Sequence, residues 1–207
     1  MILAAIGNIN GRDRALAAAL EAIAGEGIHT IVHTGNAIVG GPGGNEVVSL
    51  LEQYNVVCVQ GNNDRLAVRY SRKQESLERK LDPALVDAIR EANDRLSSQN
   101  LEKVRDWRKS RAFTLEDLAV FACHGSPGNP REILTPDTPL VKWRRQREMA
   151  RADIILCGGA ESLFSLEVDG SLFVCPGALE GASGGVSYTC INTEGTPWEA
   201  APVIVAP

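Results

Sequence analysis

The fold class is indicated by residues 1–36, which read MILAAIGNINGRDRALAAALEAIAGEGIHTIVHTGN. A continuous apolar run, Ile2–Ile6, ends at a turn of glycine and asparagine. Apolar residues at helical spacing follow over 12–24, and a β-branched run over 28–33 ends at Gly35-Asn36. Strand, helix and strand in this order predict a parallel βαβ unit.

The same rhythm continues after residue 36. Apolar residues at helical spacing over 45–54 predict a helix, and Val56–Val59 predicts a strand that ends at Gly61-Asn62-Asn63. Three successive strands therefore each end in a turn of glycine and asparagine. In open α/β sheets, ligands bind beyond the carboxyl ends of the parallel strands. We therefore expect these turns to lie together at a candidate binding edge.

The remainder of the chain follows a different order. Residues 65–111 are charged and helical in pattern, with Asp82-Pro83 as a helix start, and they predict a helical insertion. After them we expect a helix over 141–152 and strands over 113–115, 118–122, 154–157, 163–168, 172–174, 186–192 and 202–205. Together these elements predict one α/β domain over 1–207, with 65–111 as an insertion within it.

Composition limits the classes of function. The chain has 207 residues and a net charge of −5, which fits one domain of about 150 residues or somewhat more and disfavours nucleic acid as a partner. No apolar run reaches the roughly 18 residues of a membrane span. The five cysteines form no Cys-x-x-Cys pair, as expected of buried thiols in a reducing compartment. We predict a cytoplasmic protein, and assembly with further copies of itself is left open.

Five turns at predicted strand ends carry a family resemblance. They are Gly7-Asn8-Ile9-Asn10, Gly35-Asn36, Gly61-Asn62-Asn63-Asp64, Cys123-His124-Gly125 and Gly158-Gly159-Ala160-Glu161. Their order and spacing resemble the calcineurin-like metallophosphoesterase superfamily, especially its small bacterial and archaeal phosphodiesterases, over nearly the whole chain. The resemblance implies a sandwich of two mixed β-sheets flanked by helices.

The resemblance also implies a site for two divalent metals, but most of its residues are replaced. The family's Asp-x-His falls on Asn8 and Asn10, and its bridging Asp falls on Asn36. Its metal-binding Asn falls on Asn62, and its general-acid His falls on Asn63. Its later His falls on His124, and the two His of its final Gly-His-x-His fall on Gly159 and Glu161. Only Asn62 and His124 match the family's pattern.

These replacements predict the loss of the metals. Carboxamide oxygens bind Mg²⁺ or Ca²⁺ mainly beside carboxylates, and Mn²⁺, iron and Zn²⁺ favour imidazole or thiolate. Glu161 is the one charged candidate at these positions. We therefore expect no cofactor, or at most one weakly bound divalent metal on Asn62, His124 and Glu161. We also expect no catalytic residue, because Asn63 cannot act as a general acid.

The sequence thus favours a non-catalytic binding or scaffold module, as the retromer subunit of this superfamily is. Its pocket would be formed by residues at the strand ends, namely Asn8, Asn10, Asn36, Asn62, Asn63, His124 and Glu161. These side chains would either satisfy one another's hydrogen bonds or hold a polar ligand, as in a small-molecule sensor. The partner, a protein or a small molecule, is not identified. The alternative is an enzyme, a divergent metal-dependent phosphodiesterase with a reduced metal site.

Two further features leave alternatives open. Lys142–Arg151 carries five basic residues and Trp143, which fits either a docking surface for an acidic partner or a solvated helix face. Cys123 and Cys157 lie at predicted strand ends near His124, where a thiol nucleophile is conceivable. However, strand alternation predicts that Cys123 points away from the side that His124 faces.

Overall fold

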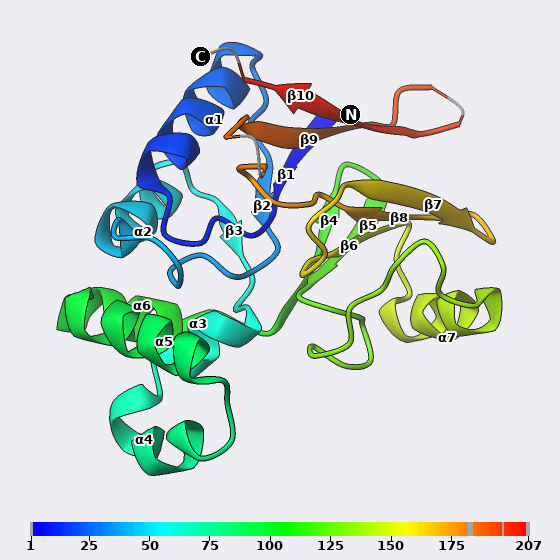
Figure 1. The fold of residues 1–207 in the computed structure, drawn as a ribbon. Coiled ribbons are helices and arrows are strands. Elements are labelled where there is room, and N and C mark those ends of the chain that lie inside the picture. The colour runs from blue at the N-terminus through cyan, green and yellow to red at the C-terminus, as the bar shows by residue number, and fades with distance from the viewer. Residues whose placement is uncertain (1, 182–183, 196, 206–207) are drawn as a thin grey trace.

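The computed structural model describes residues 2–181, 184–195 and 197–205, which form a sandwich of two five-stranded sheets (Figure 1). The first sheet has the order β10-β9-β1-β2-β3, and its strands are β1 Ile2–Ile6, β2 Ile31–His33, β3 Val57–Cys58, β9 Ser187–Asn192 and β10 Glu199–Ile204. The second sheet has the order β4-β5-β6-β8-β7, and its strands are β4 Ser110–Leu115, β5 Leu118–Cys123, β6 Ile154–Cys157, β7 Phe164–Val168 and β8 Ser171–Cys175.

Each sheet contains three parallel strands and is completed by antiparallel ones. In the first sheet β1, β2 and β3 are parallel, and β9 and β10 add antiparallel pairs beside β1. In the second sheet β5, β6 and β8 are parallel, and β4 and β7 form antiparallel edges. The prediction of two mixed sheets flanked by helices is therefore confirmed.

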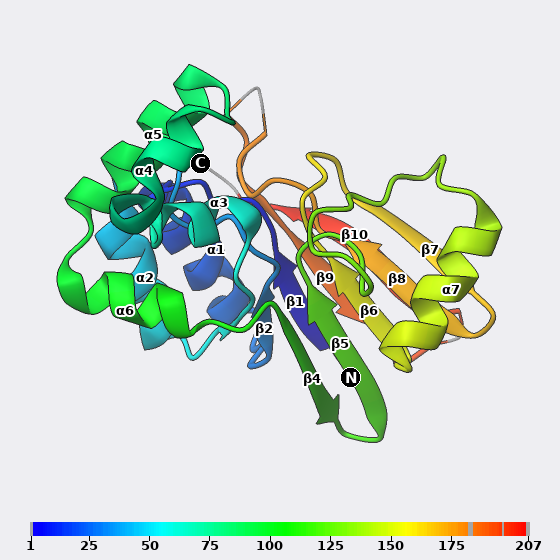
Figure 2. The ribbon, with the colours of Figure 1, turned by 90° about the horizontal axis from the view of Figure 1, so that it is seen from below.

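Alternation of side chains along the strands divides the apolar core into three layers. Leu3, Val32 and Val120 belong to the cluster between the two sheets. On the outer face of the first sheet, Ile6 and Ile31 pack against α1 Asp13–Gly25 and α2 Gly44–Gln53. Figure 2 shows α1 and α2 on one side of the sandwich and α7 Leu140–Ala150 on the other. The order of layers is thus helices, sheet, sheet, helix.

Four helices connect the two sheets. They are α3 Asn62–Ala67, α4 Tyr70–Glu78, α5 Pro83–Arg95 and α6 Ser98–Asp106. The helical segment therefore begins three residues before the expected residue 65, because Asp64 accepts the Gly61 N–H and starts a helix there (2.9 Å). At the other end Ser110 and Arg111 already belong to β4, because they pair with Cys123 and Ala122 of β5.

Asn45 of α2 holds the turn between α5 and α6 against the first sheet's helices. Its Oδ1 accepts hydrogen bonds from the Ser97 N–H (3.0 Å) and from Asn100 Nδ2 (2.9 Å), and its Nδ2 donates to the Arg95 carbonyl (2.9 Å). The helical segment is therefore fixed at both the start of α3 and the start of α6. No helix in the described part of the chain is long and apolar enough to cross a bilayer.

Candidate functional site

Three asparagines at the carboxyl ends of β1 and β2 adopt left-handed backbone conformations. The φ angles are 38° at Asn8, 52° at Asn10 and 62° at Asn36. Asparagine tolerates this region better than most residues other than glycine. The backbone N–H of Asn10 also donates to the Asn36 carbonyl (2.9 Å), so the two turns are joined directly.

A directed chain of hydrogen bonds links the side chains of Asn8 and Asn36. The Asn63 N–H donates to Asn36 Oδ1 (3.2 Å), and Asn36 Nδ2 donates to Asn8 Oδ1 (3.2 Å). Asn8 Nδ2 then donates to Glu161 Oε1 (3.1 Å) and to the Ala160 carbonyl (3.2 Å). Because the chain ends on two pure acceptors, the orientation of both amide groups is fixed by the network. The amide groups thus satisfy one another, and Asn8 donates one hydrogen bond to the Glu161 carboxylate.

Asn62 and His124 lie in the same region but are bonded to other partners. Asn62 Nδ2 donates to the Pro130 carbonyl (3.0 Å), and Asn62 Oδ1 accepts from Arg65 Nη2 (3.3 Å). His124 Nδ1–H donates to the Thr34 carbonyl (2.8 Å) and so connects the end of β5 with the end of β2. The predicted residues therefore share one edge of the sandwich, but only Asn8, Asn36 and Glu161 are joined side chain to side chain.

The His124 ring lies in a space that glycines leave open. A Cβ on Gly35, where φ is +102°, would lie 2.7 Å from His124 Nδ1. The ring is 1% exposed, and burial lowers its pKa, against the opposing effects of the Thr34 carbonyl and Asp64. His124 is therefore neutral near pH 7 with the proton on Nδ1, which leaves the Nε2 lone pair as its remaining acceptor.

Asp64 has a structural role that the sequence did not reveal. Its side chain is 0% exposed and accepts backbone N–H groups from Asn36 (2.9 Å), Ala37 (2.8 Å), Ile38 (3.1 Å) and Gly61 (2.9 Å). Burial raises the pKa of Asp64. The hydrogen bonds from Gly61, Ile38 and Ala37 and the electrostatic effect of the nearby His124 oppose the rise. The signal in the sequence is an acidic residue three positions after Gly61, at the start of a helix.

Ile133 fills the space beside Gly159. Gly159 has a φ of +89°, and a Cβ built on it would overlap Ile133 Cδ1 and lie 3.6 Å from His124 Cε1. A histidine at this position, as the family has, would need both a strained backbone and displacement of Ile133. Nothing in the sequence marked Ile133, because it is one apolar residue in a proline-rich loop.

The side chains at this edge do not fit as ligands of a pair of divalent ions. Asn36 would have to bridge two ions, yet its Nδ2 carries N–H groups towards Asn8 and its Oδ1 already accepts from Asn63. Among the described residues, no group of three or more His, Cys, Asp or Glu is placed to hold a metal. Two dications held by neutral amides and one carboxylate would lack the charge balance that such sites have.

The side chains of Cys123 and Cys157 end β5 and β6 but face the cluster beneath α7, the helix that carries the basic stretch. Cys123 packs beside Trp143 in the cluster beneath α7, with its Sγ 4.0 Å from that of Cys157. The hydrogen bond with the Cys123 thiol and burial raise the pKa of the Cys157 thiol. A raised pKa disfavours a thiolate nucleophile. Trp143 is 1% exposed, so it does not accompany the basic residues of α7 on the surface.

Comparison with known proteins agrees with this architecture. The sequence model of the calcineurin-like phosphoesterase superfamily domain matches residues 1–196, so the chain belongs to that superfamily. Among solved structures, the chain is similar to the hypothetical protein PH1004 from Pyrococcus horikoshii OT3, with a TM-score of 0.83 and 20% identity over 99% of this chain and 87% of that one. A search of the curated proteins found no significant match.

Two further solved structures share the fold. A metallophosphoesterase from Sphaerobacter thermophilus has a TM-score of 0.69 and 19% identity, over 100% of this chain and 88% of that one. A novel archaeal phosphodiesterase has a TM-score of 0.59 and 15% identity, over 99% of both chains. At these identities the likeness supports the fold and says nothing of the reaction.

Proposed function

We propose that this chain is a non-catalytic binding or scaffold module built on the metallophosphoesterase fold. The hydrogen bond from Asn36 Nδ2 to Asn8 Oδ1 carries the proposal. In the family's pattern both positions hold carboxylates that face metal ions, whereas here a donor and an acceptor face each other. The amide pair needs no ion to be stable, because each of its members is satisfied within the protein.

The position of the family's general acid supports the same proposal. Asn63 stands there, and a carboxamide has no proton that it can deliver to a leaving group. Its backbone N–H is instead part of the amide chain through Asn36. With neither metal activation of water nor a proton donor, the two largest contributions to phosphoester hydrolysis in this family's mechanism would be missing.

A reduced phosphodiesterase is the second candidate, and one observation favours it. His124 donates its Nδ1–H to a backbone carbonyl, which is the orientation that metal-binding histidines adopt. However, Asn62 Oδ1 accepts from Arg65, and Glu161 accepts from Asn8. A single ion on Asn62, His124 and Glu161 would have to share the Asn62 and Glu161 oxygens with these two hydrogen-bond donors.

Purified protein is expected to carry no stoichiometric manganese, iron or zinc by inductively coupled plasma mass spectrometry. Hydrolysis of bis-p-nitrophenyl phosphate with added Mn²⁺ is expected to stay at the rate of the buffer. Treatment with EDTA should leave the melting temperature within about one degree, since a ligand that is not bound cannot stabilise the folded state. Two ions per chain, or a rate that EDTA abolishes, would favour the enzyme instead.

Restoring the family's ligands should restore metal binding if the positions truly correspond. We expect the combination of Asn8→Asp, Asn10→His, Asn36→Asp, Asn63→His and Glu161→His to bind Mn²⁺ in calorimetry. Gly159→His is left out because its Cβ would overlap Ile133, and adding it should lower the melting temperature. The control is the single change Asn8→Asp, which is expected to bind no pair of Mn²⁺ ions because the bridging position still holds Asn36 and no imidazole has been added. A folded fivefold variant without Mn²⁺ binding would show that the correspondence is wrong.

A further inference from the structure

Three arginines near Asn62 have no carboxylate partner among the residues that the structure describes. Arg65 is half-buried on α3, Arg69 follows one helical turn later, and Arg131 lies in the loop after β5. Burial, and then the positive charges of Arg131 and Arg69, lower the pKa of the Arg65 guanidinium. In the described part of the chain, the ion pairs involve other basic residues, namely Arg12, Arg90, Arg95, Lys103, Lys142 and Arg144.

Asn62 ties two of these arginine-bearing segments together. Its Oδ1 accepts from Arg65 Nη2 (3.3 Å), and its Nδ2 donates to the carbonyl of Pro130 (3.0 Å), the residue directly before Arg131. The guanidinium of Arg65 is thus oriented from one side, and the backbone beside Arg131 is held from the other. The residue that matches the family's metal-binding asparagine here acts as a bridge between α3 and the loop.

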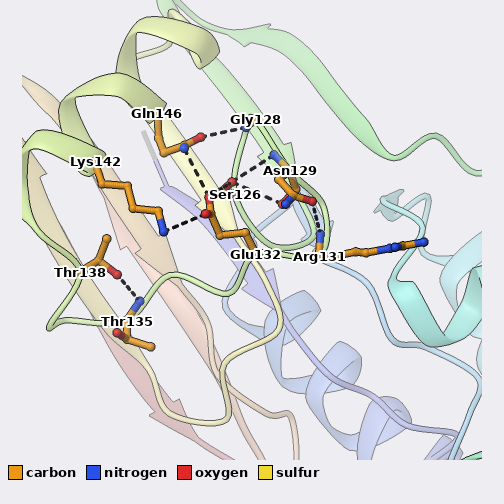
Figure 3. Close-up of polar contacts among 9 residues, drawn as sticks. All are labelled: Ser126, Gly128, Asn129, Arg131, Glu132, Thr135, Thr138, Lys142 and Gln146. Carbon is orange, nitrogen blue, oxygen red and sulfur yellow. Dashed lines mark hydrogen bonds and ion pairs between the residues drawn. The ribbon is translucent and has the colours of Figure 1, made fainter. Parts of the chain in front are cut away.

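The loop is also fixed on the far side of Arg131. Glu132 accepts hydrogen bonds from Ser126 Oγ (2.7 Å) and Gln146 Nε2 (3.4 Å) and forms an ion pair with Lys142 (2.7 Å). Figure 3 shows these contacts converging on Glu132, while the Arg131 side chain extends away from them towards the helical segment. The neighbours of Arg131 are thus anchored, while its exposed guanidinium has no ion pair within the described part of the chain.

Two acidic side chains at the same edge already accept hydrogen bonds from other groups. Asp64 directs its two oxygens to four backbone N–H groups, and Glu161 accepts from Asn8 at the other end of the amide chain. Neither of them pairs with Arg65, Arg69 or Arg131. Like charges placed close together without counter-charge are unfavourable, and a bound anion would relieve this.

We propose that Arg65, Arg69 and Arg131 form a metal-independent site for a compact, multiply charged oxyanion of the phosphate type. This inference rests on the proposed function and names the ligand class of the binding module. Guanidinium groups present parallel N–H donors that match the oxygens of such anions, and these charge-assisted bonds are stronger than neutral ones. Positive charge that two ions supply elsewhere in the family is here supplied by side chains.

Calorimetric titration with pyrophosphate and with inorganic phosphate, in EDTA and at constant ionic strength, tests the site. We expect saturable binding, with pyrophosphate bound more tightly because it carries more charge. Arg65→Ala and Arg131→Ala are each expected to weaken the binding by about tenfold or more. Arg131 is exposed, so its substitution should not affect folding. Arg79→Ala, at an exposed arginine beyond α4, is the matched control and should leave the binding unchanged.

Two results would overturn the site. One is the absence of saturable binding in EDTA, and the other is an equal loss in Arg79→Ala, which would indicate a diffuse charge effect. The failure of the proposed function is distinguishable, because it would appear as hydrolysis that depends on Mn²⁺. Metal-free binding that the arginine variants weaken would support the anion site even then.

Discussion

Asp64→Ala is expected to lower the free energy of unfolding by about 4 kcal/mol or more. The carboxylate accepts four backbone N–H groups, from Asn36, Ala37, Ile38 and Gly61, and it is fully buried. A carboxylate has about four acceptor sites, and all of them are used. Alanine would leave these donors without partners in the interior, at about 1–3 kcal/mol for each donor that water cannot reach.

Urea denaturation followed by circular dichroism measures this loss, and Asp82→Ala is the matched control. Asp82 also accepts a backbone N–H, that of Ala84 (2.9 Å), but it is an exposed helix cap. Its loss should cost about 1 kcal/mol. Asp64→Asn keeps the shape but offers one acceptor oxygen in place of two, so its cost should fall between the two alanine variants. Equal costs at Asp64 and Asp82 would contradict the role assigned to Asp64.

The elements of the fold were predictable because their signals are local. Ile2–Ile6 and Ile154–Cys157 have the predicted bounds, and α1 differs from the predicted 12–24 by one residue at each end. Runs of apolar residues and helical spacing depend on neighbours within one turn, so the sequence displays them. The glycine–asparagine turns follow β1 and β2, as predicted, and Asn8 and Asn36 both have positive φ there.

The interior of the site was less predictable because its contacts join distant parts of the chain. Asn62 bonds to Pro130, 68 positions later, and Asn8 bonds to Glu161, 153 positions later. Ile133 fills the space at Gly159 through a loop that has no periodic pattern. Positions could therefore be assigned from turn order, whereas the partner of each side chain could not. The result is a network in which the amide at 8 and the carboxylate at 161 depend on each other.

His33 is expected to make the protein lose stability as the pH falls below about 6.5. The side chain is 0% exposed, and within the described residues neither ring nitrogen has a hydrogen-bond partner. Burial lowers the pKa of His33 to about 3, repulsion from His124 adds to this where that ring is also protonated, and the Gly35 backbone opposes the shift. Between about pH 3 and the ordinary value near 6.5, the unfolded chain therefore binds a proton that the folded chain excludes. The free energy of unfolding therefore falls as the pH falls across this window, and below about pH 3 His33 changes it no further.

The size of the effect follows from the shift and separates His33 from other acid-labile groups. Going from pH 7 to pH 4 should cost about 3 kcal/mol through His33 alone. His33→Phe keeps an aromatic ring beside Trp107, whose centroid lies 6.1 Å away, and it removes the titration. Urea denaturation at both pH values should therefore show a smaller loss in His33→Phe than in the wild type by about this amount. His29→Gln changes an exposed histidine and should lose as much as the wild type. Equal losses in all three proteins would mean that protonation of His33 does not oppose folding, and that its ring is solvated on acidification without unfolding.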